Sequence, residues 1–148
     1  MGHTLLARRE RRSIGSRSSR ILGVAILLAA FSGSSRADQF VIANPSVAFS
    51  GDEVREVYLG EKQFAGEQKL VPVDNTAVQG LFLSRVLRMT PSRYETAWIK
   101  KSFREGLAIP AVRSSNSETL EFVRHTPGAV GYVVADKPPT GVVVVTKF

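Results

Sequence analysis

Two short polar segments carry the residue types that bind small anions. Asn75, Thr76 and Ala77 stand between an apolar run and a helical pattern. The first turn of a helix leaves backbone N–H groups unpaired and carries the positive end of the helix dipole, so this segment could hold an oxyanion. Asp74 favours a simpler interpretation, because its carboxylate repels an anion and Asp-Asn-Thr before a helix is also typical of N-capping. Both interpretations stay open at this point.

The second segment consists of Arg113, Ser114 and Ser115, followed by Asn116 at another predicted helix start. Arg113 would supply a cation and the two serines hydroxyl groups. If both loops leave the carboxyl ends of neighbouring strands, they lie at the same edge of the sheet. The alternative for Arg113 is an ordinary solvated arginine. The candidate ligand-binding residues are therefore Asn75, Thr76, Ala77, Arg113, Ser114 and Ser115.

Other site chemistries find little support in the sequence. The chain has no cysteine, and its two histidines are His3 and His125. His125 lies near a predicted helix C-terminus, where an imidazolium interacts favourably with the helix dipole. No serine stands in a G-x-S-x-G pattern, and no group of residues has the spacing of metal ligands. We therefore expect no catalytic residue, no metal and no cofactor, and we predict that the protein is not an enzyme.

The first 37 residues have the three regions of a secretory signal peptide. A basic stretch ends at Arg20, an apolar run covers residues 21–31, and Ser35 and Ala37 provide small residues before a cleavage point. Seven of the 20 basic residues and one of the 13 acidic residues lie in this leader, so the leader carries +6 of the net charge of +7. The remaining +1 gives no support to nucleic-acid binding. We predict a signal peptide over residues 1–37, a domain over residues 38–148, and a periplasmic or secreted location.

Strand and helix patterns alternate along the predicted domain. A capping box at Ser50 opens one helix, Pro91 stands at the first position of another that Gly106 ends, and Ser115 caps a third. On the Pro91 helix, Tyr94, Ala97, Trp98, Ile99 and Phe103 are predicted to form the apolar surface, with Tyr94, Trp98 and Phe103 in the core. The predicted extended segments are residues 39–43, 70–73, 107–112, 129–135 and 141–148, and residues 61–69 are expected to form a loop.

The strand runs are apolar without clean alternation, which indicates a sheet covered on both faces. The sequence therefore predicts an α/β fold with helices against both sides of the sheet. The segment "HTPGAVGYVVA", residues 125–135, ends a helix, makes a Pro-Gly turn and enters a central strand.

The order of these elements resembles the single-lobe relatives of the phosphate-binding proteins that serve ABC importers. The matching segments are "VIANPSV", "DEVREVYLGEK", "LVPVD", "PSRYETAWIKKSF" and "ETLEFVRHTPGAVGYV". The most specific are the Y-x-x-x-W step from Tyr94 to Trp98 and the "TPGAVGYV" ending. The resemblance implies a three-layer αβα single lobe of the type II periplasmic binding protein superfamily, with a mixed sheet covered by helices on both faces.

The resemblance also implies a function. It implies binding of a phosphate-like oxyanion, with a membrane transporter or a sensor as partner, and an association with an ABC transporter. The turn after "LVPV" reads Asp74-Asn75-Thr76, however, and lacks the Ser-Gly-Thr element by which the family holds its ligand. The alternative function is therefore a periplasmic accessory or sensor protein that binds no small ligand and acts by docking on another protein.

Overall fold

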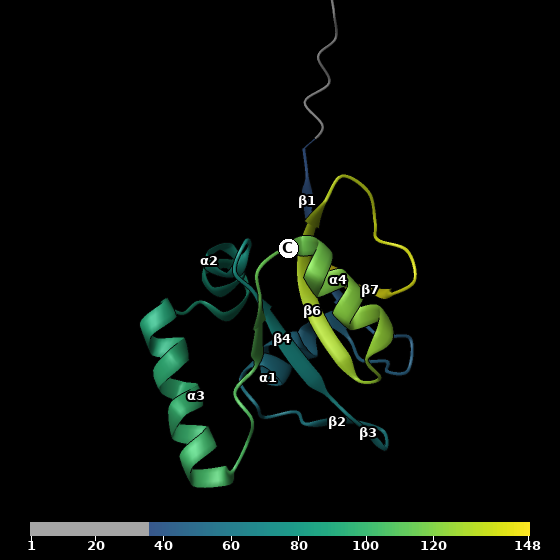
Figure 1. The fold of residues 1–148 in the computed structure, drawn as a ribbon. Coiled ribbons are helices and arrows are strands. Elements are labelled where there is room, and N and C mark those ends of the chain that lie inside the picture. Colours follow the sequence, from purple (N-terminus) through teal and green to yellow (C-terminus); the bar gives the residue numbers. More distant parts are fainter. Residues whose placement is uncertain (1–35) are drawn as a thin grey trace, which may run out of the picture. The chain divides into compact units, whose positions relative to one another are not determined.

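A computed structural model describes residues 36–148, so the predicted leader, residues 1–37, lies outside the described residues except for its last two. The main sheet has five strands in the order β5-β4-β6-β1-β7 (Figure 1). β4 runs parallel to β5 and β6, whereas β1 is antiparallel to β6 and β7. The strands are β1 (Asp38–Ala43), β4 (Val71–Asn75), β5 (Ala111–Arg113), β6 (Ala129–Ala135) and β7 (Val143–Lys147). The prediction of a mixed sheet is confirmed.

The helices lie on both faces of this sheet, as predicted. Successive residues of β1 belong to two different hydrophobic clusters. Val41 belongs to the larger cluster, with side chains of α1, α2, η2 and α3, whereas Phe40 and Ile42 belong to the smaller cluster, with Val123 of α4. The helical elements are η1 (Gly51–Glu53), α1 (Val54–Tyr58), α2 (Gln79–Phe82), η2 (Leu83–Leu87), α3 (Pro91–Glu105) and α4 (Asn116–His125). Because successive strand residues point to opposite faces, continuous apolar runs are what a sheet covered on both sides requires.

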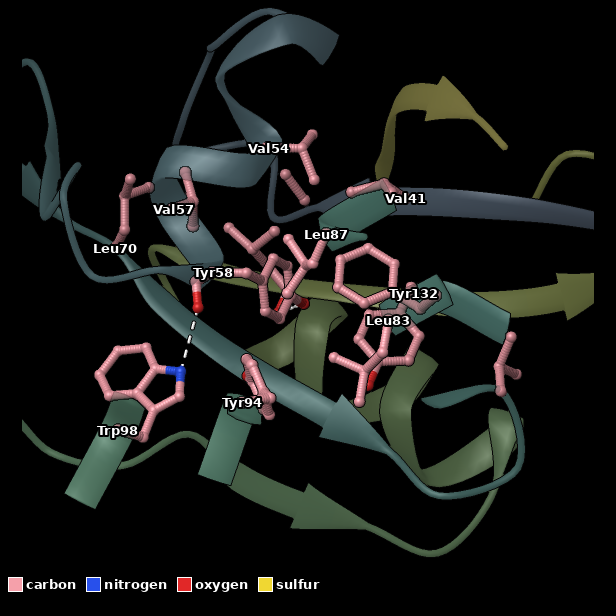
Figure 2. Close-up of a cluster of buried hydrophobic side chains, with 14 of the residues drawn as sticks. Val41, Val54, Val57, Tyr58, Leu70, Leu83, Leu87, Tyr94, Trp98 and Tyr132 are labelled. Atoms are coloured by element: carbon pink, nitrogen blue, oxygen red, sulfur yellow. Dashed lines mark hydrogen bonds between the residues drawn. The ribbon is translucent and has the colours of Figure 1, made fainter. Parts of the chain in front are cut away.

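The larger cluster has an aromatic centre. Phe82 stacks on Tyr132 with ring centroids 4.0 Å apart, and Tyr58 meets Phe82 edge to face at 4.7 Å. Figure 2 shows Tyr58 and Tyr132 among valine and leucine side chains from α1, η2 and the strands. The Tyr58 hydroxyl donates to the carbonyls of Val73 and Val130, so this buried polar group is satisfied.

Several local predictions need correction. Residues 61–69, expected as a loop, contain a short hairpin of β2 (Phe64–Ala65) and β3 (Gln68–Lys69). The predicted capping by residues 74–76 is wrong, because β4 continues through Asn75 and the next helix begins at Gln79 without a side-chain cap. That helix soon widens into the π-helix η2, which ends at Arg88 in a left-handed conformation. The capping box at Ser50 and the first position of Pro91 in α3 follow the prediction, and the Thr90 hydroxyl also caps α3 by accepting from the Arg93 amide.

Helix α3 is attached to the lobe by the two aromatic residues of the Y-x-x-x-W step. Tyr94 and Trp98 are its buried residues, and the Trp98 Nε1 donates to the Tyr58 carbonyl at 3.0 Å. The prediction that Phe103 belongs to the core is wrong: its side chain is 92% exposed, and Ile99 is 53% exposed. Both lie on the solvent side of α3, where no element among residues 36–148 covers the helix.

Two glycines explain the "TPGAVGYV" ending. Gly128 has a φ of +80°, and a Cβ on it would lie 2.0 Å from the Lys69 carbonyl oxygen. A Cβ on Gly131 would lie 2.8 Å from the Thr119 Cγ2, where α4 crosses β6. Only glycine allows both close approaches.

Candidate functional site

The two predicted loops do meet at one edge of the sheet. β4 and β5 are parallel neighbours, and their register pairs Asn75 with Arg113, the last residue of each strand. The Thr76 amide donates to the Arg113 carbonyl at 3.0 Å, which ties one loop directly to the other. The six candidate residues therefore lie at the carboxyl ends of neighbouring parallel strands, where ligands bind in open α/β sheets.

Asn75 holds three elements together. It is fully buried, and its Nδ2 donates to the Asn116 Oδ1 at 2.9 Å and to the Tyr132 carbonyl at 3.0 Å. Its Oδ1 accepts from the Ala77 amide at 3.1 Å. The hydrogen-bonding groups that the anion hypothesis needs from Asn75 and Ala77 are thus already paired with protein atoms.

Thr76 is also turned toward protein acceptors. Its hydroxyl lies 3.4 Å from the Arg113 carbonyl oxygen and 3.3 Å from that of Ser114. These are long contacts, and a stronger acceptor could replace them.

A carboxylate of the protein occupies the second loop. The Glu118 Oε2 accepts from both the Ser114 amide at 3.0 Å and the Ser114 hydroxyl at 2.7 Å. The Glu118 amide in turn donates to the Ser115 hydroxyl, so Ser115 caps α4 as predicted. The two bonds from Ser114, with the Arg113 charge contributing less, hold the pKa of Glu118 below its usual value. Glu118 therefore uses the donors that a bound oxyanion would need.

Arg113 is positioned against α4. Its guanidinium carbon lies 4.2 Å from the centroid of the Phe122 ring, a cation–π contact. Its Nε is buried and finds no acceptor among the described residues. The stacking on Phe122 fixes the arginine beside Glu118, so its charge favours the internal carboxylate.

Asp74 is part of a buried polar cluster that the sequence analysis missed. Its carboxylate accepts from the Tyr132 hydroxyl at 2.8 Å and from the Tyr94 hydroxyl at 3.0 Å. Burial raises the pKa of Asp74, although the two tyrosine hydroxyls partly offset the effect. Burial, and next the Asp74 charge, raise the pKa of both tyrosines. Asp74 therefore faces the core, where it links β4 to α3 and β6.

This cluster predicts a pH dependence of stability. Because the pKa of Asp74 is raised in the folded state, the folded protein binds more protons than the unfolded chain between about pH 3.9 and the folded pKa. The Asp74 contribution to the free energy of unfolding should therefore fall as pH rises through this window. Urea denaturation of wild type and Asp74→Asn across the window should show this fall only in wild type. Parallel pH profiles for the two proteins would contradict it.

His125 lies at the C-terminal end of α4, as predicted, with its Nδ1 2.9 Å from the Glu121 carbonyl oxygen. Within residues 36–148, no group of three or more histidine and acidic residues is arranged to hold a metal ion. None of the helices in that part of the chain combines the length and apolarity needed to cross a bilayer.

The fold is an α/β lobe that matches part of a solved phosphate ABC transporter substrate-binding protein. A phosphate ABC transporter substrate-binding protein from Clostridium perfringens, solved with bound phosphate, matches with a TM-score of 0.55 and 12% identity over 74% of this chain and 44% of that one. An ABC-type phosphate transport receptor from Vibrio cholerae gives a TM-score of 0.46 and 17% identity over 74% of this chain and 45% of that one. PstS from Borrelia burgdorferi gives 0.45 and 18%, over 66% and 40%.

The chain thus spans less than half the length of each of these solved proteins. The Clostridium perfringens structure confirms the predicted fold. No protein-family model and no curated protein matches the sequence.

Proposed function

We propose that this chain is an exported lobe of the phosphate-binding-protein type that acts by docking on a partner protein, not by holding a free oxyanion. The carrying observation is the exposed face of α3. Phe103 is 92% exposed and Ile99, one helical turn earlier, is 53% exposed. A phenylalanine so fully exposed to water is unusual, and an exposed apolar patch with a polar rim is typical of a protein contact.

Charged residues define the partner's chemistry. Lys100 and Arg104 each follow one of the two apolar residues, and Arg93 lies in line with these two basic residues, whereas Glu95 lies one helical turn before Ile99. Aromatic and arginine side chains are the residues that most often dominate binding energy in interfaces. The partner surface should therefore offer an apolar depression, with acidic residues on the side that meets Lys100 and Arg104.

The arrangement of the two loops supports the same proposal. The Glu118 carboxylate accepts from Ser114, and the Asn75 Oδ1 accepts from the Ala77 amide. The Thr76 amide donates to the Arg113 carbonyl. A free oxyanion would have to displace these contacts. Export is part of the proposal and is supported by the leader pattern, with cleavage after Ala37 leaving a mature chain of residues 38–148.

Site-specific photo-crosslinking in the cells that produce the protein tests the docking surface. A photoreactive phenylalanine analogue at position 103 or 99 should give one discrete cross-linked product. The same analogue at Phe64, which is 52% exposed on the β2–β3 hairpin, is the matched control and should give none. Combining the probe at 103 with Lys100→Glu and Arg104→Glu should remove the product. Equal cross-linking at all three positions, or none at 103, would reject this surface.

A second candidate function is weak binding of a phosphate-like oxyanion. The observation in its favour is the shared fold with a solved protein that holds phosphate. It requires the Glu118 carboxylate to leave Ser114, so that the start of α4 and Arg113 face the ligand.

A further inference from the structure

A groove lies at the end of the lobe opposite the two loops, where β4 begins. Its volume is about 320 Å³, within the range of small-molecule sites. Its walls come from the start of β4, from Trp98 in the middle of α3, from the end of α1 with the segment after it, and from the irregular segment 106–110 before β5. The apolar side chains that line it include Leu70, Val71, Pro72, Trp98, Leu107 and Ile109.

Trp98 forms one end of this groove. The indole is 4% exposed and is held in place by its hydrogen bond to the Tyr58 carbonyl. Figure 2 shows Trp98 at the end of the aromatic cluster nearest Leu70, with the dashed bond to Tyr58. Because Trp98 is the single tryptophan of the chain, tryptophan emission reports on the surroundings of this one side chain, which include the groove.

The charges around the groove are positive. Lys62 and Lys69 are among its lining residues, which include no aspartate or glutamate. The Lys62 Nζ lies 3.0 Å from the Glu53 Oε1 and forms an ion pair with it. Lys69 forms no ion pair with any described residue. A ligand with an apolar body would release water from the apolar walls of the groove. A negatively charged group at one end of this ligand would form an ion pair with Lys69.

We propose that this groove binds a small amphiphile with an apolar body and one carboxylate. The apolar body lies against Trp98, Leu70 and Ile109, and the carboxylate pairs with Lys69 at the rim. This site is separate from the α3 docking surface and from the loops after β4 and β5, and it does not depend on either.

Three probes of equal chain length test the proposal: octanoate, octanol and octylammonium, titrated into the purified protein while Trp98 emission is followed. Octanoate should give a saturable change. Octanol should bind about two- to fivefold more weakly, as expected for loss of an exposed ion pair. Octylammonium carries the same charge as Lys69 and should bind more weakly than octanol. Equal responses to octanoate and octylammonium would overturn the proposal.

Two pairs of variants locate the site. Ala108 is an exposed groove residue, and Ala108→Phe should weaken octanoate binding about tenfold by filling the space. Ala48→Phe, at an exposed position away from the groove, should have no effect. Lys69→Gln should reduce octanoate to the affinity of octanol, and Lys137→Gln should not. Thermal melts confirm that each variant is folded.

A second copy of the chain is the competing occupant. If it covers the groove, Trp98 emission will change with protein concentration without a ligand, and sedimentation will show a dimer. That result, or an Ala48→Phe variant as weak as Ala108→Phe, would overturn the proposal.

Discussion

Gly128→Ala is expected to destabilise the lobe by about 3 kcal/mol or more. Two costs combine at this position: a φ of +80°, which L-residues rarely adopt, and a Cβ only 2.0 Å from the Lys69 carbonyl oxygen. The second cost is the larger, because the obstructing atom is backbone and its movement would disturb the hairpin and the start of β4. Urea denaturation followed by circular dichroism measures the loss.

Gly66→Ala is the matched control. Gly66 has a similar φ of +60°, but no atom lies within 4 Å of the added Cβ. It should lose only the conformational cost of about 1 kcal/mol. The difference in the free energy of unfolding between the two variants therefore isolates the cost of the clash. Equal losses would show that the backbone near Gly128 shifts at little cost.

Trp98→Ala is expected to cost about 3 to 5 kcal/mol, since a large buried aromatic is removed. Trp98 and Tyr94 are the two buried residues of α3, so the 15-residue helix loses one of its two buried side chains. Trp98→Phe should cost less, because it keeps most of the packing and loses mainly the hydrogen bond to the Tyr58 carbonyl. Unfolding must be followed by circular dichroism, because the single tryptophan is gone. A loss below about 1 kcal/mol for Trp98→Ala would show that α3 is held by other contacts.

Much of the fold was predictable from local patterns. The apolar runs located four of the five strands of the main sheet, whereas only the last two residues of the predicted segment 107–112 belong to β5. Ser50, Pro91 and Ser115 located three helix starts, since capping depends on a few adjacent residues. The Tyr94 and Trp98 step predicted two core residues correctly. Phe103 was wrongly predicted to lie in the core, because it continues the apolar surface of α3. No local sequence pattern shows that this part of α3 lies beyond the packed core.

The position of the candidate site was predictable from the sequence, but the hydrogen bonds within it were not. The strand–helix order brought the Asn75 and Arg113 loops to one edge, as expected from parallel neighbours. Capping by Asp74 failed because its partners, Tyr94 and Tyr132, are 20 and 58 residues away. Glu118 was predictable as a capping residue. Its bonds to Ser114 depend on the loop conformation, which the sequence pattern does not determine.

The effect of phosphate on thermal stability tests most directly whether the loops after β4 and β5 hold a free oxyanion. The protein should be melted with increasing phosphate, and with chloride at equal ionic strength, for wild type, Glu118→Gln and Glu118→Gln with Arg113→Ala. We expect no phosphate-specific shift for wild type, because the Glu118 carboxylate already accepts from the Ser114 amide and hydroxyl. A phosphate-specific shift that appears only in Glu118→Gln and disappears with Arg113→Ala would agree with it. A saturable shift in wild type, reaching about 2.7 kcal/mol at 100 times the dissociation constant, would contradict it and make the lobe an oxyanion-binding protein.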